Sequence, residues 1–241
     1  MFGIQIDRLT MDETVDRVGE LIDGGVPTQH CAVNAGKIVL MEDDEELRRI
    51  IGSCALVSAD GQAVVWASHI LGDPLPERVA GIDLFMRLLS LAERQGYSVY
   101  FLGARPEVVA EVVRRARLRH PSLRVAGWHD GYFTEADQPE LLAEIAGVHP
   151  DILLVGMPSP RKEYWLAANL ERTRATFAMG VGGSFDILAG VTTRAPYLLQ
   201  RLGLEWAWRF AAEPRRLWRR YFVGNFRFLS ITARQRRRGR L

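Results

Sequence analysis

A carboxylate stands directly after one of the short apolar runs of this chain. Asp60 ends the segment "CALVSAD" (54–60) and precedes a helical pattern. If the run is a strand, this side chain lies at the mouth of a sheet, where it can act as a general base. It can equally cap the helix that follows, because aspartate oxygens accept hydrogen bonds from the free N–H groups at a helix start. The sequence alone favours neither interpretation.

Two further segments carry charge where apolar runs end. In "GDPLPERVAG", Arg78 lies in a proline-punctuated loop, where a guanidinium can pair with a phosphate or form a structural salt bridge. In "VGMPSPRKEYW" (155–165), dense charge follows an apolar run, which indicates a ligand contact. The candidate residues of this second segment are Pro160, Arg161, Lys162 and Glu163.

Glycines gather at the end of another apolar run, in "MGVGGSFDILAG" (179–190). Gly182 and Gly183 would let backbone amides approach a phosphate or nucleotide closely, and Asp186 opens the next helix. Tight packing of a strand against a helix also needs glycine. Both interpretations therefore stay open.

The usual carboxylate arrangement for a metal–nucleotide complex is missing. No two aspartates have D-x-D spacing, and the five histidines show no metal-ligand spacing. Cys31 and Cys54 form no C-x-x-C pair. We therefore expect neither a metal site nor a bound cofactor.

Short apolar runs alternate with amphipathic segments along most of the chain. Helical signals fit the segments between the runs, with Pro106 at a first-turn position and Gly96 at a helix end. This alternation predicts a Rossmann-like α/β fold, a mostly parallel sheet with helices on both faces, whose ligands collect at the carboxyl ends of the strands. The expected strands are 30–34, 54–60, 98–104, 123–128, 151–157 and 175–183, and the expected helices include 82–95, 106–118 and 137–147.

The pattern changes after residue 196 to a helical segment rich in arginine and tryptophan. We expect an α/β domain over 1–196 and a C-terminal helical appendage over 197–241. The appendage is predicted to break near Glu213-Pro214, because proline disfavours helix in the residue before it. Its basic end, "RQRRRGR" (234–240), is expected to be disordered.

Charge is distributed unevenly. Residues 201–241 hold 12 arginines, no lysine and 2 acids, a net charge of +10, whereas residues 1–200 carry −8. A cationic segment with tryptophans suits the headgroup region of a membrane. Because neither a signal peptide nor an apolar run long enough to span a bilayer is visible, we expect a cytoplasmic protein that touches a membrane.

Nine segments in this order resemble the WecG/TagA/CpsF family of bacterial glycosyltransferases. The match covers roughly residues 30–221. The segments are "VNAGKIV" (33–39), "ADG" (59–61), "RVAGIDL" (78–84), "FLGARPEV" (101–108), "GWHDGYF" (127–133), "DILLVGMPSPRKE" (151–163), "GVGGSFDILAG" (180–190), "RAP" (194–196) and "LGLEWAWRFAAEPRRLWRRY" (202–221).

The resemblance implies an inverting glycosyltransferase that needs no metal. It would move a sugar from a UDP-sugar to a polyprenyl-diphosphate-linked acceptor at the inner face of the cytoplasmic membrane, for cell-surface polysaccharide or cell-wall polymer synthesis. It also implies oligomers of the chain.

Site residues follow from the resemblance by position. Asp60 would be the base that deprotonates the acceptor hydroxyl, with Asn34 beside it, and Arg78 would face the donor diphosphate. The loop 156–163 with Gly182 and Gly183 would hold the uridine nucleotide. The appendage would close over the site and contact the acceptor or the leaving diphosphate through Arg209, Arg216, Arg219 and Arg220.

Two departures from the family pattern concern the donor side. Ala32 stands where many relatives have threonine, and Lys162 replaces a glutamine. An exchange of amide for cation near the nucleotide changes donor contacts, so the donor sugar does not follow from the resemblance.

Three other classes of protein compete with this interpretation. A non-catalytic membrane-associated scaffold with a degenerate site fits the two departures. A nucleic-acid-binding protein fits the arginine tail but lacks a recognisable binding motif, so we expect no nucleic-acid partner. A nucleotide-dependent oxidoreductase would need a G-x-G-x-x-G after the first strand, and none is present.

Overall fold

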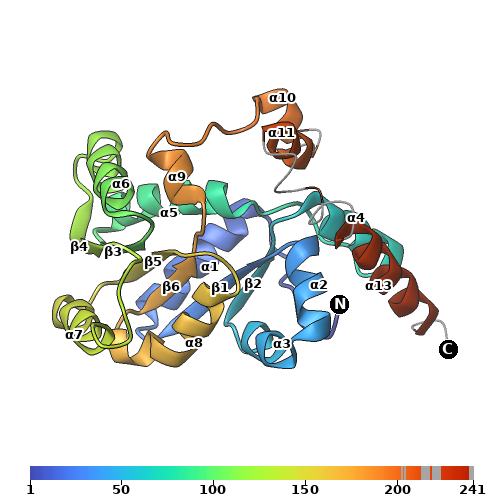
Figure 1. Cartoon of the computed structure of the whole chain (residues 1–241), viewed down its shortest axis with the longest axis horizontal. Helices are drawn as coiled ribbons and strands as arrows, with labels where there is room; N and C mark the ends of the chain where they lie inside the picture. The colour runs from blue at the N-terminus through green and yellow to red at the C-terminus, as the bar shows by residue number, and fades with distance from the viewer. Residues whose placement is uncertain (202, 204, 213–217, 219–223, 239–241) are drawn as a thin grey trace.

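A single sheet of six parallel strands forms the centre of the molecule (Figure 1). The computed structural model describes residues 1–241 other than 202, 204, 213–217, 219–223 and 239–241. The strand order is β2-β1-β6-β5-β3-β4. The strands are β1 (Thr28–Val33), β2 (Leu56–Ala59), β3 (Ser98–Gly103), β4 (Arg124–His129), β5 (Ile152–Gly156) and β6 (Phe177–Gly180). All six lie within or next to the predicted ranges, so the predicted fold class is confirmed.

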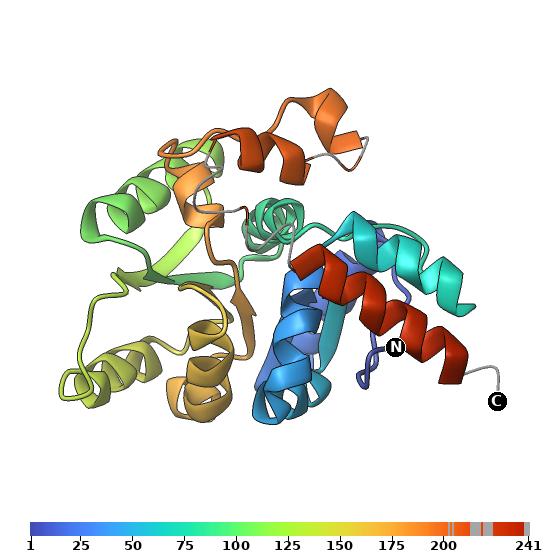
Figure 2. The same cartoon turned by 45° about the vertical axis from the view of Figure 1, so that its right-hand side comes forward.

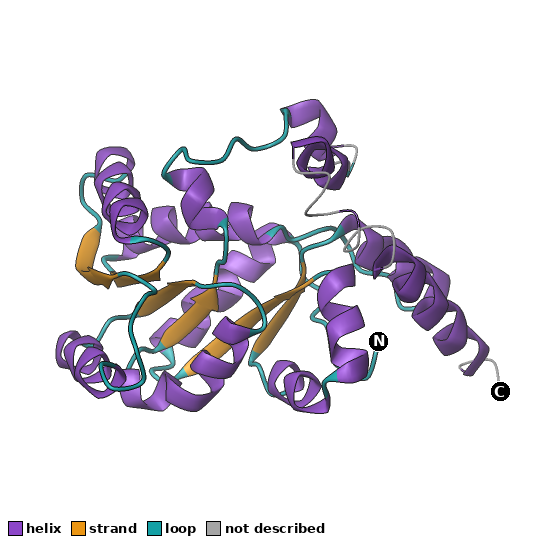
Figure 3. Ribbon diagram, in the orientation of Figure 1, coloured by secondary structure: helices purple, strands orange, loops and turns teal. Residues whose placement is uncertain are grey.

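The central strands β3 and β5 are buried at every residue because helices cover both sides of the sheet (Figure 3). In β3, Val99 and Phe101 enter one core cluster, whereas Tyr100 and Leu102 enter another. Successive side chains of a strand point to opposite faces. The chain therefore needs a separate apolar layer on each side of the sheet.

Helices from different parts of the chain build the two layers. The first layer contains α1 (Met11–Asp23), α5 (Gly81–Gln95), α6 (Pro106–Arg119) and α9 (Ser184–Leu188). The second contains α2 (Ala35–Asp43), α3 (Glu45–Gly52), α4 (Gln62–Leu71), α7 (Gln138–Val148) and α8 (Arg161–Thr173).

Local signals fix where several of these helices begin and end. Thr10 and Glu13 form a reciprocal capping box at the start of α1. Pro106 is the first residue of α6, and Gly96 ends α5 with a left-handed φ of 75°. Both of these predicted signals are confirmed.

The C-terminal part contains α10 (Tyr197–Arg201), α11 (Glu205–Ala212) and α13 (Gly224–Arg238). Helix α13, red in Figure 2, lies alongside α4 and α2 and shares their core cluster through Phe228. The rings of Phe228 and Phe2 are 5.6 Å apart. Hence this helix packs on the α/β body. It also continues to Arg238, into the segment that the sequence analysis expects to be disordered.

Other expectations for this part concern the predicted break and the membrane. Glu213 and Pro214, where we expect the break, lie outside the described residues. Among the residues that the structure describes, no helix is both long enough and apolar enough to cross a bilayer.

Candidate active site

Several of the predicted site residues lie at the carboxyl ends of β1, β2, β5 and β6. Asn34 follows β1, Asp60 follows β2, the loop 157–160 follows β5, and the residues after Gly180 follow β6. Neighbouring parallel strands bring their carboxyl ends to one edge of the sheet. We call this edge, with the residues just named, the strand-end site.

Asp60 is held by a helix other than the one it precedes. Helix α4 has Gly61 as its N-cap and no side-chain cap. Instead, Asp60 Oδ1 accepts a hydrogen bond of 2.8 Å from the backbone N–H of Gly81, the first residue of α5. The interpretation that Asp60 caps the following helix is therefore wrong. In the described part of the chain Oδ2 has no partner, so it is available to accept a proton.

Asn34 lies beside Asp60. Its side-chain oxygen accepts from the backbone N–H of Lys37 at 3.1 Å and so caps α2. A methyl group placed on Gly61 would lie 3.2 Å from the Asn34 Cβ, which means that the two strand ends touch. The structure thus brings Asn34 next to the backbone of residues 60 and 61.

Arg78 reaches the same edge but is already paired. The loop that carries it is tied to β2 by a hydrogen bond from Val79 N to Ala59 O, 2.9 Å long. Arg78 Nη1 lies 2.6 Å from Oε2 of Glu205 in α11. The guanidinium that we predict to bind a phosphate is therefore paired with a carboxylate of the C-terminal part.

Lys162 and Glu163 belong to a buried charge cluster beneath the strand-end site. Lys37 Nζ lies 2.8 Å from Glu163 Oε1 and donates to Ala32 O at 2.6 Å. Lys162 Nζ donates to Gly180 O at 3.1 Å. Two cations therefore face one carboxylate, and the predicted external ligand contact of Glu163 is replaced by a buried ion pair.

The pKa values of this cluster follow from its geometry. Burial would lower the pKa of Lys37, but the Cys31 sulfur and the Glu163 carboxylate raise it above its ordinary value. Burial and the nearby Lys37 lower the pKa of Lys162. Burial would raise the pKa of Glu163, but the charges of Lys37 and Lys162 outweigh burial and lower this pKa.

His30 is a buried neighbour of this cluster that the sequence analysis does not single out. Its Nε2 lies 2.9 Å from Ser58 Oγ, and its Nδ1 has no hydrogen-bond partner in the described residues. Burial, then Lys37 and Lys162, lower the pKa of His30 to about 3. The imidazole is therefore neutral.

The glycines after β6 make room for Lys162. A Cβ on Gly180 would lie 2.8 Å from Lys162 Cδ, and one on Gly182, whose φ is +53°, would lie 3.3 Å from Lys162 Nζ. Gly180 thus leaves room for the stem of Lys162, and the left-handed φ of Gly182 favours glycine at that position. Gly183 has more space, with only Asp186 Oδ2 at 3.9 Å, so an amide approach remains possible there in steric terms.

The remaining residues of the 156–163 loop point in other directions. Pro160 is the N-cap of α8, and its carbonyl accepts from the backbone N–H of Tyr164. The guanidinium of Arg161 lies over the ring of Phe133, 5.6 Å from its centroid. Arg161 is thus directed towards the β4–α7 loop.

Of the predicted tail arginines, Arg209 belongs to helix α11. Arg216, Arg219 and Arg220 lie outside the described residues.

Sequence reasoning misses four residues that the structure places at or next to the site: Lys37, Asp83, Arg194 and Glu205. Signals for two of them exist. Lys37 is a lysine in the apolar segment "AGKIVLM", and Glu205 is one of 2 acids in the arginine-rich tail. Arg194 binds Asp83 with both terminal nitrogens, at 2.5 and 2.7 Å, which no local pattern indicates.

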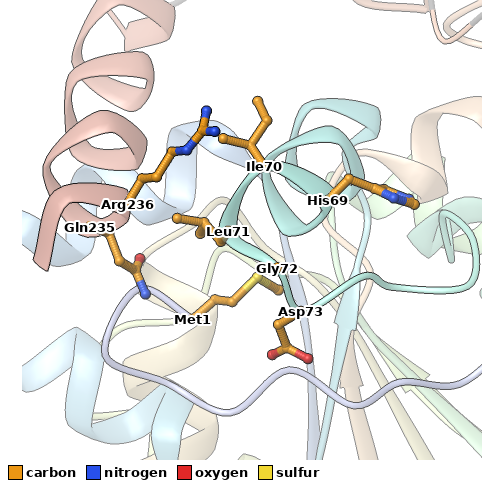
Figure 4. Close-up of a pocket in the computed structure, with 8 residues that line it drawn as sticks. All are labelled: Met1, His69, Ile70, Leu71, Gly72, Asp73, Gln235 and Arg236. Carbon is orange, nitrogen blue, oxygen red and sulfur yellow. The ribbon is translucent and has the colours of Figure 1, made fainter. Parts of the chain in front are cut away.

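The described cavity lies away from the strand-end site. A cavity of about 420 Å³ opens between the last turns of α4 and α13, where Gln235, Arg236, His69 and Met1 line it (Figure 4). None of the predicted site residues lines it. Within the described ranges, no three His, Cys, Asp or Glu side chains gather as a metal site would need.

Comparison with known proteins shows a family and a similar relative. Over residues 1–241 the chain matches the sequence model of the "Glycosyl transferase WecG/TagA/CpsF family". It is also similar to the N-acetylglucosaminyldiphosphoundecaprenol N-acetyl-beta-D-mannosaminyltransferase of Bacillus spizizenii, with 37% identity over 171 residues. The matched region covers 71% of this chain and 65% of that relative.

Proposed function

Since this chain belongs to the WecG/TagA/CpsF family of glycosyl transferases, we propose that it moves a sugar from a UDP-sugar to a polyprenyl-diphosphate-linked acceptor. The name of the Bacillus relative states an acceptor on diphosphoundecaprenol and an N-acetylmannosaminyl group, which supports this acceptor class and a hexosaminyl donor here. We place the reaction at the inner face of the cytoplasmic membrane.

One observation carries the chemical part of the proposal. The Asp60 carboxylate sits at the carboxyl end of β2 with Oδ1 fixed by Gly81 N and with Oδ2 unoccupied by the described residues. A base needs a fixed orientation and an accepting oxygen. Asn34, directly beside it, offers an amide that can position the sugar or the acceptor.

The proposed transfer is a single displacement. Asp60 Oδ2 takes the proton of the acceptor hydroxyl while the hydroxyl oxygen forms a bond to the anomeric carbon. The bond from that carbon to the UDP oxygen breaks on the opposite side, so the configuration inverts and UDP leaves with the bonding electron pair. The proton then passes from Asp60 to solvent.

Cations rather than a metal would stabilise the leaving diphosphate. We assign this role to Arg78 and to the tail arginines Arg209, Arg216, Arg219 and Arg220. One guanidinium group can donate two parallel hydrogen bonds to two oxygens of a phosphate. The uridine would contact the loop 156–163 and Gly183. Under this assignment the enzyme works without a bound cofactor.

The test is release of UDP from a panel of UDP-sugars with polyprenyl-diphosphate-linked acceptors in the presence of EDTA. Asp60→Asn keeps an oxygen for Gly81 N but loses the base, so we expect turnover to fall by about 10²–10⁴-fold while the protein stays folded. The matched control is Asp16→Asn, which removes an exposed carboxylate of α1.

Acceptor-dependent turnover that survives EDTA and collapses only in Asp60→Asn supports the proposal and identifies the donor. Full activity of Asp60→Asn would disprove the role of Asp60. Absence of turnover with every pair of substrates, in a folded protein that binds membranes, would favour the scaffold alternative.

A further inference from the structure

Arg78 holds a carboxylate in the place where the proposed function puts a diphosphate. The Arg78 and Glu205 side chains are only 16% and 14% exposed, and their closest atoms are 2.6 Å apart. Their contact is thus a partly desolvated ion pair rather than a surface one. In such a pair the attraction between the charges offsets the cost of their desolvation only when the geometry is good.

A second guanidinium shares the same carboxylate. Arg194 Nε lies 3.1 Å from Glu205 Oε1, the oxygen that Arg78 does not contact. Two arginines therefore approach the two oxygens of one anionic group from separate parts of the chain. This is the way in which proteins hold phosphate oxygens.

Arg194 is itself fixed from behind. Its Nη1 and Nη2 donate to the two oxygens of Asp83 in α5. The planar fork of this guanidinium therefore keeps its direction whether or not Glu205 is present. Its Nε is left to face the shared anion.

The charges explain why an external anion would be accepted. Arg78, Arg194 and Asp83 together carry one net positive charge, which Glu205 cancels. Although burial alone would raise the pKa of Glu205, hydrogen bonds from Arg78 and Arg194 lower it, so the carboxylate is ionised. If Glu205 moved away, the remaining three groups would attract an anion.

These groups lie next to the proposed base. The segment 79–81 links Arg78 to Asp60 through Val79 N to Ala59 O and Gly81 N to Asp60 Oδ1. On the other side, a Cβ on Gly203 would lie 2.8 Å from Cγ of Gln62, so the turn before α11 packs at the start of α4. The start of the helix that carries Glu205 therefore lies beside the strand-end site.

We propose that Arg78 and Arg194 form one diphosphate-binding site and that Glu205 is an internal stand-in for this ligand, displaced when the ligand binds. The inference rests on the proposed function for the class of ligand, and it adds Arg194 and Glu205 to the binding machinery. The diphosphate can belong to the nucleotide or to the lipid-linked acceptor. Binding shifts the start of α11 away from Arg78.

The experiment measures binding by titration calorimetry of wild-type protein and of Glu205→Gln. The probes are UDP, inorganic pyrophosphate, geranyl diphosphate and, as a probe without phosphate, uridine. We expect Glu205→Gln to bind the diphosphate probes about tenfold more tightly, since one competing charge is removed, and uridine with unchanged affinity. Tighter binding of UDP alone assigns the site to the donor, and of geranyl diphosphate alone to the acceptor.

Two further variants separate competition from general charge and folding effects. Glu46→Gln removes the same charge from an exposed side chain of α3 and is expected to leave all affinities unchanged. Arg194→Gln should weaken pyrophosphate binding about tenfold and leave uridine binding as it is. Hydrogen exchange of α11 should increase in wild-type protein when pyrophosphate is added.

Unchanged or weaker diphosphate binding by Glu205→Gln would overturn the inference, because Glu205 would then only anchor α11. This result leaves the proposed function standing if UDP-sugar turnover is observed. Conversely, tighter pyrophosphate binding by Glu205→Gln with no turnover of any UDP-sugar would retain the binding site and reject the proposed reaction.

Discussion

The buried cluster below the strand-end site combines two lysines with one carboxylate. Lys37 and Lys162 both act on His30, which is itself buried and bonded to Ser58. A protonated imidazole would be a third positive charge beside these two lysines, and it would be buried with them. The histidine must therefore stay neutral for the strand ends to keep this packing.

This neutral histidine predicts a dependence of stability on pH. The pKa of His30 is about 3 in the folded protein and near 6.5 in the unfolded chain. Between these values the unfolded state binds the extra proton, so stability is full above pH 6.5 and falls as the pH decreases towards 3. We expect the free energy of unfolding to fall by roughly 2–3 kcal/mol from pH 6.5 to 4.5, measured by urea denaturation.

His30→Gln keeps a polar group for Ser58 but cannot titrate, and it should flatten this slope. The control His69→Gln replaces an exposed imidazole of α4 and should retain it. Below about pH 4.5, carboxylates whose pKa is lowered by ion pairs, such as Glu163, add their own loss. An equal slope in wild type and His30→Gln would show that His30 does not control stability in this range.

At the scale of elements, α13 contributes to the core of the α/β body. Phe228 is 3% exposed and stacks near Phe2, whereas Phe226, two residues earlier, is 75% exposed. Ion pairs from Arg227 to Asp43 and from Arg234 to Glu42 hold the flank of α13 against α2. The helix is thus fixed by burial on one face and by charge along one side.

Two phenylalanine substitutions distinguish a packed helix from a detachable one. Phe228→Ala should lower the free energy of unfolding by about 3 kcal/mol, because it leaves a cavity between α13 and the N-terminal segment at Phe2. Phe226→Ala, the same change on the solvent face, should alter it by less than about 0.5 kcal/mol. Chemical denaturation followed by fluorescence measures both, and equal effects would contradict the described packing.

The elements follow well from the sequence, but their mutual contacts do not. The strands follow from short apolar runs. Pro106 and Gly96 mark a helix start and a helix end through their own backbone preferences, which do not depend on distant contacts. Asp60 is different, because its partner Gly81 N belongs to another helix and depends on how the loop 72–80 folds back. The same reason hides the Glu205–Arg78 pair, whose members are 127 positions apart in the chain.

Glycines illustrate a second limit of sequence reasoning. Gly182 fits either a backbone approach to phosphate or tight packing by its sequence, and the neighbour that it meets in the structure is Lys162. A glycine in the sequence indicates only that another group can lie close to its backbone. The identity of that neighbour is a property of the assembled sheet.

At the scale of the whole molecule, the arginines of α13 whose side chains the structure describes divide into two groups. Arg227 and Arg234 are engaged with acids of the body, whereas Arg236 and Arg237 are exposed on the last turns of α13. Only exposed cations contribute to attraction by an anionic surface at full strength. The second group is therefore expected to contribute to the proposed membrane contact.

The corresponding prediction concerns binding to vesicles that contain phosphatidylglycerol. Replacement of Arg236 and Arg237 by glutamine should weaken binding by roughly 30-fold, because each basic residue near such a surface contributes about 1 kcal/mol. Co-sedimentation at low and high salt measures it. The matched control replaces Arg117 and Arg119 of α6 by glutamine, and equal weakening by both double variants would indicate that orientation plays no part.

The pairing of β1 with β6 has a kinetic consequence. Asn34 and Asp60 follow the first two strands, whereas Lys162 and the glycines lie at or after the ends of the last two. The β1–β6 ladder pairs Thr28 with Phe177, a residue 149 positions further along the chain. Closing so long a loop costs conformational entropy before any contact between the halves is gained, so this ladder forms late. A refolding chain should accordingly recover most of its secondary structure in an early phase and its ligand binding only in the last one.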